Sequence, residues 1–391
     1  MRPVHGRFLT EIHVTTAPYS RPSAAASARR TRQVISDNTL GWAIVGASAM
    51  ARRNIVPAIR NQPPLIEEDV RYPVSSSAVV GVFSRDAARA RMFADEAFIP
   101  HAFVNLTDLI ERQDVHCVYV GGHPRHHMQV TLAALAAGKH VLCETPMALN
   151  LEEATTMAHT AASAGLRLGV NYVRRADPAV RTMREMVVRR DIGDVLGARV
   201  TNMTLLEPAM QTWRLLPGGG GAVLHRVVHS VDLVRYLLRD EIASVYARST
   251  LQILSNVVEE DVISQLKMRR TGRIVELRDS FLVPHNMTRM EIFGSAGTLI
   301  ANNCLVDEPN SELLLVQNQQ QFEAPIELSN PYVEAVKRFN DAVRNAGQLL
   351  AGSGDGLNNL AVALAIQESA KTGRPLAIPT PDRQVDDRSV I

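Results

Sequence analysis

The sequence lacks the features that mark membrane proteins, disulfide-rich secreted proteins or nucleic-acid-binding proteins. It has three cysteines in 391 residues and a formal net charge of +2. No apolar run approaches the ~20 residues that a membrane-spanning helix needs. The near-neutral charge, without a long basic run, argues against a nucleic acid partner. The composition, 46% apolar and 21% charged, is typical of a globular protein.

The cysteines Cys117, Cys143 and Cys304 are scattered without metal-ligand spacing. Cys117 and Cys143 lie in apolar runs typical of strands, so we expect buried, reduced thiols. Reduced thiols fit the cytoplasm, which we predict as the location, with no membrane association.

The first 40 residues are rich in Ser, Ala, Arg and Pro and have no periodicity. We predict that residues 1–40 are a disordered or non-core tail. Arg29 and Arg30 resemble the start of a twin-arginine export signal. The apolar stretch that follows, residues 42–45, is too short for such a signal and is better used as the first core strand.

The length predicts two domains. Over residues 41–169, helical stretches alternate with short apolar runs, which is typical of buried parallel strands. The runs are residues 42–45, 78–83, 117–120 and 140–143. This α/β alternation predicts a Rossmann-type doubly wound parallel sheet. The long polar connection at residues 63–77 is predicted to be a surface loop.

Residues 170–391 have a different pattern. Between residues 195 and 322 the β-type runs are longer and alternate, and helical signal appears only around residues 221–238. This predicts an α+β second domain built on a mostly antiparallel sheet. Two C-terminal helices follow, and packing back onto the Rossmann domain is one arrangement open to them.

The loop after the first strand, residues 46–51, reads GASAMA and opens a helix. Gly46 supplies a tight turn, and Ser48 and Ala51 are small enough for a pyrophosphate to approach the helix N-terminus. A purely structural turn would have the same sequence. The position of the loop, early in a βαβ unit, is what favours a dinucleotide-binding loop. The predicted cofactor contacts in this loop are Gly46, Ala47, Ser48, Ala49 and Met50.

The second strand ends at Ser84 and Arg85. Sites that prefer NAD place an acidic residue here for the ribose hydroxyls. A serine and an arginine suit a 2′-phosphate instead, because guanidinium pairing with phosphate is strong. The pair therefore favours NADP(H), with NAD still possible. An ordinary exposed arginine at a helix start is the alternative interpretation.

Further motifs follow in a fixed order. They are Glu144-Thr145-Pro146, residues 171–175 (NYVRR), Trp213-Arg214, and residues 218–221 (GGGG) followed by His225, His229 and Asp232. Taken together, they make the chain resemble the Gfo/Idh/MocA family over about residues 41–378. The motifs are most similar to those of the family's 1,5-anhydro-D-fructose reductase branch.

The resemblance implies a Rossmann domain followed by an open-faced sheet domain, with the nicotinamide between them. In the family, a lysine of Glu-Lys-Pro and a histidine of Asp-x-x-x-His face the substrate carbon. The histidine exchanges a proton with the substrate hydroxyl as hydride moves, and the lysine orients the oxygen. The sheet often mediates oligomer contacts, so we expect a homo-oligomer, a dimer or a tetramer.

Carried onto this chain, the catalytic residues are His229, His225 and Thr145. His229 matches the histidine, Thr145 replaces the lysine, and His225 replaces the aspartate. Threonine is neutral and cannot supply a lysine's electrostatic stabilisation of a developing alkoxide, often worth several kcal/mol. The site loses one positive and one negative group together. Two interpretations explain this double change. One is a rebuilt proton relay that uses both histidines, and the other is an active site that has lost its activity.

The resemblance places further residues beside the cofactor or the substrate. These are Gly121, Gly122, His123, Glu144, Arg175, Trp213 and Arg214. His127 keeps a histidine of the family, but we interpret His126 and His127 as a surface pair at a helix N-terminus. His225 and His229 also have metal-ligand spacing. No third ligand is indicated, so we predict no metal.

The predicted function is an NADP(H)-preferring oxidoreductase of a hydroxyl or carbonyl group on a sugar, cyclitol or similar polar ring. His229 is the general acid/base. The alternative is a nucleotide-binding homologue without net redox activity, either regulatory or performing redox-neutral elimination or glycoside chemistry. Substrate choice is expected to depend on residues 205–216 and His225, and the substrate is a small molecule.

Overall fold

A six-stranded parallel sheet forms the first part of the fold. The structure is a computed structural model that describes residues 39–62, 76–285, 287–306 and 310–380. The strand order is β3-β2-β1-β4-β5-β6. The strands are β1 (Leu40–Val45), β2 (Ser77–Phe83), β3 (His101–Phe103), β4 (Cys117–Val120), β5 (His140–Cys143) and β6 (Leu168–Val170). This confirms the predicted doubly wound sheet.

Helices connect these strands, as the alternating pattern predicts. They are α2 (Val56–Arg60), α3 (Ala87–Glu96), α4 (Leu106–Ile110), α5 (His127–Ala136) and α6 (Leu151–Ala164). Asn150 caps α6 by accepting a hydrogen bond from the Glu153 amide at 2.9 Å. Glu153 itself bonds the Leu149 amide at 3.3 Å, one residue away from a standard capping box.

The second sheet has nine strands in the order β14-β13-β12-β11-β7-β10-β9-β8-β15. Its neighbours are antiparallel except for β7 and β10, which are parallel. The strands are β7 (Val195–Met203), β8 (Ile242–Thr250), β9 (Asp261–Met268), β10 (Ile274–Ser280), β11 (Met287–Gly294), β12 (Thr298–Asn302), β13 (Glu312–Gln317), β14 (Gln320–Glu323) and β15 (Leu376–Ala377). The predicted, mostly antiparallel sheet is confirmed.

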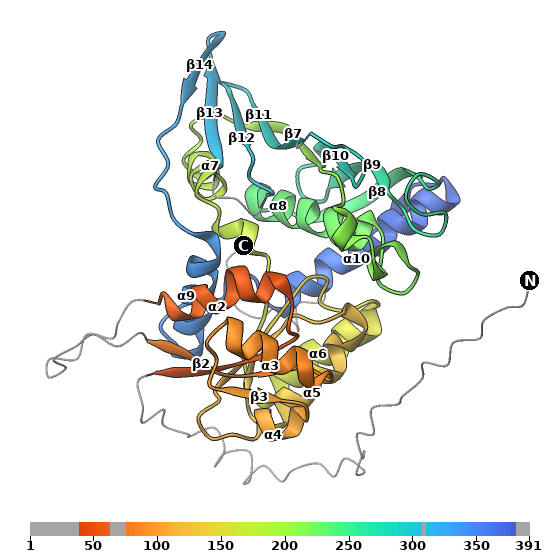
Figure 1. The fold of residues 1–391 in the computed structure, drawn as a ribbon. Coiled ribbons are helices and arrows are strands. Elements are labelled where there is room, and N and C mark those ends of the chain that lie inside the picture. The colour runs from red at the N-terminus through yellow and green to blue at the C-terminus, as the bar shows by residue number, and fades with distance from the viewer. Residues whose placement is uncertain (1–38, 63–75, 286, 307–309, 381–391) are drawn as a thin grey trace, which may run out of the picture. The chain divides into compact units, whose positions relative to one another are not determined.

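Helices α7 (Pro178–Arg189), α8 (Val228–Leu238) and α10 (Ser353–Thr372) cover one face of this sheet (Figure 1). Strand β9 shows the consequence, because its residues alternate between buried and exposed. Val262, Ser264 and Leu266 are buried, whereas Ile263 on the other face is 47% exposed. Such alternation is typical of an antiparallel sheet with one covered face.

The helices near the C-terminus contact both sheets. In α9 (Pro331–Val343), Phe339 packs against Trp42 of β1 with a ring-centroid distance of 5.2 Å, and Asn340 accepts a hydrogen bond from the Trp42 indole at 3.2 Å. Helix α10 contacts α6 of the first part and β8 of the second. A buried tryptophan needs such a partner for its N–H group.

Other predictions concern the chain's ends and its cysteines. All three cysteines are free and buried, as expected. The predicted tail lies outside the described residues except for its last two positions, and β1 begins at Leu40. The predicted surface loop at 63–77 also lies mostly outside them. Among the described residues, no helix is long and apolar enough to cross a membrane.

Candidate active site

The turn after β1 has the geometry that a close-approach loop needs. Gly46 has φ +110°, and a Cβ there would lie 2.8 Å from the backbone of Gly121 and Gly122. Ser48 takes the place of a second glycine, and its hydroxyl accepts the Ala51 amide at 3.1 Å. The loop remains accessible: Gly46, Ala47, Ser48 and Met50 are half-buried, and Ala49 is exposed.

At the end of the neighbouring strand β2, Ser84 is half-buried and Arg85 is exposed. The Ser84 hydroxyl accepts the Asp86 amide at 3.3 Å. Within the described chain, Arg85 forms no ion pair. Burial, together with the charges of Arg85 and Arg125, lowers the pKa of nearby His126 to about 4.

Glu144 follows β5, and its side chain forms hydrogen bonds to residues at the ends of β4 and β6. Its Oε1 accepts hydrogen bonds from the Tyr119 hydroxyl of β4 at 2.8 Å and from Asn171 Nδ2, after β6, at 2.6 Å. The Thr145 amide donates to its Oε2 at 3.3 Å. We did not predict Tyr119 as part of this arrangement. A tyrosine in an otherwise apolar buried strand is the signal, since its hydroxyl needs a partner.

Thr145 and His229 meet across the site. Thr145 Oγ1 lies 3.1 Å from His229 Nε2, although the two residues are 84 positions apart. Tyr172 packs edge-on against the His229 ring at 5.9 Å. Thr145 is therefore hydrogen-bonded to the predicted general acid/base.

His225 belongs to a π-helical turn, η6 (Val223–Val227), that leads into α8. Its Nε2 is enclosed and makes no hydrogen bond to the described residues. Burial lowers the pKa of His225 well below its ordinary value, and the charges of Arg214 and Arg226 act in the same direction. This enclosure disfavours the cationic form of His225.

A row of rings joins the two parts of the site. His123 lies 4.2 Å from Trp213, and Trp213 lies 5.0 Å from His225, between ring centroids. The Arg214 guanidinium lies over the Trp213 ring at 4.6 Å. A Cβ on Gly219 would lie 3.0 Å from the His123 ring. The loop that carries Trp213 thus packs on the segment after β4.

Arg175 differs from the prediction. Its side chain is 0% exposed and forms ion pairs with Asp232 at 2.7 Å and with Asp355 of α10 at 3.0 Å. It also donates to the Leu350 carbonyl at 2.9 Å. A guanidinium enclosed in this way offers no surface to a cofactor or a substrate. Its place is in a buried charge network that anchors α8.

The interpretation of His126 and His127 as a surface pair is wrong for His127. His126 is half-buried, but His127 is only 1% exposed. His225 and His229, which have metal-ligand spacing, gain no third ligand here, since the described residues contain no group of three or more His, Cys, Asp and Glu that could hold a metal ion.

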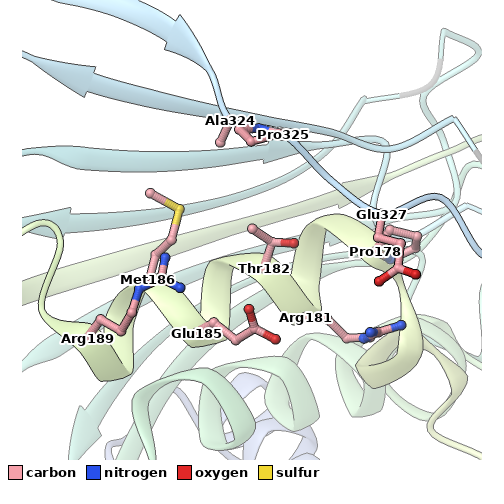
Figure 2. Close-up of a pocket in the computed structure, with 9 residues that line it drawn as sticks. All are labelled: Pro178, Arg181, Thr182, Glu185, Met186, Arg189, Ala324, Pro325 and Glu327. Atoms are coloured by element: carbon pink, nitrogen blue, oxygen red, sulfur yellow. The ribbon is translucent and has the colours of Figure 1, made fainter.

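A hollow of about 360 Å³ lies elsewhere, between α7 and the segment after β14 (Figure 2). Met186, Glu185 and Arg181 line it from α7, and Ala324 and Pro325 line it from the other side. None of the predicted site residues contributes to it.

Comparison with known proteins identifies the family. Residues 40–172 match the Gfo/Idh/MocA oxidoreductase family with its NAD-binding Rossmann fold, and residues 180–300 match the Gfo/Idh/MocA C-terminal domain. A 1,5-anhydro-D-fructose reductase of Ensifer adhaerens is 33% identical, covering 87% of this chain and 98% of the relative. The chain belongs to the Gfo/Idh/MocA family of oxidoreductases.

Solved structures share the fold. An aldose-aldose oxidoreductase from Caulobacter crescentus, complexed with glycerol, has a TM-score of 0.78 at 22% identity, covering 87% of this chain and all of that one. A levoglucosan dehydrogenase in complex with NADH has a TM-score of 0.76 at 19% identity, covering 88% of this chain and all of that one. These two likenesses concern the fold. The family match gives the protein as an oxidoreductase with a Rossmann fold for a nicotinamide cofactor.

Proposed function

We propose that the protein transfers hydride between NADP(H) and a hydroxyl or carbonyl carbon of a sugar, cyclitol or similar ring, with His229 as general acid/base. The observation that carries this proposal is the 3.1 Å contact between Thr145 and His229 at the strand ends of the Rossmann sheet. The names of the relatives, which are sugar reductases and dehydrogenases, support the substrate class.

The residues present fit a nicotinamide dinucleotide. The turn at Gly46 has no room for a side chain, because a Cβ there would lie 2.8 Å from the backbone of Gly121 and Gly122, and this allows the tight turn that a pyrophosphate site at a helix N-terminus needs. Gly121 and Gly122 border the same turn, and a Cβ on Gly122 would meet nothing within 4 Å. Residues 46–50, Ser84 and Arg85 would hold the cofactor, which supplies or accepts the hydride when bound.

The chain's own residues handle the proton. A neutral imidazole accepts a proton from a substrate hydroxyl at one nitrogen, and its pKa range suits return of that proton. Thr145 holds His229 Nε2 in place and offers a neutral hydrogen bond to the same region. His225 lies one turn earlier in the chain, and its ring packs on Trp213 at 5.0 Å, so it would help to shape the substrate side of the site.

The test is a binding assay followed by a turnover assay. We expect NADPH fluorescence to change on addition of the protein, and a panel of sugars, cyclitols and keto-sugars to give cofactor oxidation or reduction. Binding without turnover on any substrate would contradict the redox proposal. It would favour the homologue without net redox activity.

Arg85→Ala tests the cofactor preference. Loss of a charge-assisted contact with the 2′-phosphate should raise the Kd for NADPH by about tenfold to a hundredfold and leave the Kd for NADH unchanged. Fluorescence titration measures both constants. Arg89→Ala, an exposed arginine on α3, is the matched control. Equal effects on NADPH and NADH would contradict the preference.

Thr145→Val tests the threonine. Valine keeps the shape but loses the hydroxyl that contacts His229, so kcat/KM should fall about tenfold. Thr145→Ser keeps the hydroxyl and should stay within about threefold of the parent protein. Steady-state kinetics decide between the two. If valine were as active as serine, Thr145 would have no part in the reaction.

We also propose a homo-oligomer, a dimer or a tetramer, that forms through the uncovered face of the large sheet and works in the cytoplasm. Ile263 and Ile274 on this face are 47% and 52% exposed. Exposed apolar side chains on one sheet face are typical of an association surface. Light scattering coupled to gel filtration measures the assembly size.

A further inference from the structure

His127 is enclosed between two loops of the Rossmann part. It is the first residue of α5, and its side chain is 1% exposed. Its Nδ1 lies 2.9 Å from the Pro146 carbonyl oxygen, and its Nε2 lies 3.0 Å from the Gly122 carbonyl oxygen. Both partners can only accept hydrogen bonds. A neutral imidazole donates to one of them, and an imidazolium donates to both.

The two carbonyls belong to segments that carry different parts of the site. Gly122 lies in the segment after β4, beside His123, whose ring packs on Trp213. Pro146 lies in the segment after β5, beside Thr145, which contacts His229. His127 therefore contacts the residue next to His123 and the residue next to Thr145.

The sheet does not hold these segments together by itself. The register of β4 and β5 ends at the pair Val120 and Cys143. One more backbone bond follows, from the Glu144 amide to the Val120 carbonyl at 2.9 Å. Beyond that bond, the His127 ring connects the two segments.

We propose that His127 is a positioning residue that braces the segments of residues 121–124 and 144–147. The inference rests on the proposed function only in that these segments would flank the nicotinamide. Burial lowers the pKa of His127, whereas the carbonyls of Gly122 and Pro146 and the charge of Glu153 act in the opposite direction.

Two variants distinguish a His127 ring that acts through its hydrogen bonds from one that only fills space. His127→Leu fills the space and removes both contacts, whereas His127→Gln retains an amide that donates to one carbonyl. His140→Leu is the control, because His140 is a partly buried histidine at the opposite end of β5, where its Nδ1 accepts the Arg167 amide at 3.0 Å.

The experiment is hydrogen–deuterium exchange on the full chain without cofactor, followed by NADPH titration. In His127→Leu, we expect amide exchange in both segments to rise on the order of fivefold to tenfold, the factor that one lost hydrogen bond implies. The NADPH Kd should rise by a similar factor. His127→Gln should fall between His127→Leu and the parent protein, and His140→Leu should change neither measurement.

The outcomes are distinct. Unchanged exchange in both segments of a folded His127→Leu protein would overturn the brace, and so would equal changes in His140→Leu. If His127→Leu does not fold, the intermediate result expected for His127→Gln still decides the question. Failure of the parent protein to bind NADPH would count against the proposed function alone, since exchange is measured without cofactor.

Discussion

Replacing His229 with alanine is expected to reduce kcat by at least about a hundredfold, because general acid–base groups contribute roughly 10²–10⁴ to rate. The structure gives the reason for choosing His229. It is a half-buried imidazole whose Nε2 lies 3.1 Å from the Thr145 hydroxyl. Burial lowers the pKa of His225 well below its ordinary value, which disfavours a cationic role for this residue.

The measurement is steady-state turnover with the best substrate of the panel, together with NADPH titration. Cofactor affinity should stay within about twofold, since neither ring nitrogen of His229 is needed to bind the dinucleotide. Added imidazole should restore part of the activity by occupying the space of the missing ring. His159→Ala, at an exposed histidine on α6, serves as the control.

Full activity of His229→Ala would remove this residue from the reaction. Parallel loss of NADPH binding and activity, without rescue by imidazole, would instead indicate a structural role.

The second large effect is expected in Asp232→Asn, which should lower the free energy of unfolding by about 3–5 kcal/mol. The Asp232 side chain is 1% exposed and accepts bonds from Arg175 and from Asn359 Nδ2, the latter at 2.7 Å. Neutralising it leaves the buried charge of Arg175 paired with Asp355 alone. The melting temperature should fall on the order of 10 °C.

Calorimetry or denaturant unfolding measures the change. Asp191→Asn removes an exposed pair with Arg189 at 2.8 Å and should cost no more than about 1 kcal/mol. The double variant Arg175→Met with Asp232→Asn should be more stable than Asp232→Asn alone, because it removes the buried cation that has lost its Asp232 partner. A double variant that is less stable would contradict this account.

The fold could be predicted from the sequence because each level of the pattern agrees with the others. The apolar runs at residues 42–45 and 117–120 form neighbouring strands, and the Gly46 turn follows the first of them. The alternating runs of the second part form a sheet with one covered face. Local periodicity predicts the strands themselves and the covered face, whereas the pairing of β1 with β4 is a long-range feature of the doubly wound topology.

Site residues could be predicted only where they belong to a motif that the family shares. Thr145 and His229 come together as the family resemblance implies. Arg175 could not be placed, because the Asp355 carboxylate that encloses it lies 180 positions later. His127 was misinterpreted because two adjacent histidines at a helix start suggest a polar surface, whereas the carbonyls that surround this ring belong to two different loops.

The row of rings around Trp213 gives the protein a built-in optical reporter. The chain has two tryptophans, and Trp42 is fully buried in the core beside Phe339. Trp213 lies between two imidazoles in the candidate site. Its emission overlaps the absorption of a reduced nicotinamide, so energy transfer from Trp213 would signal occupancy of the site, while Trp42 supplies a steady background.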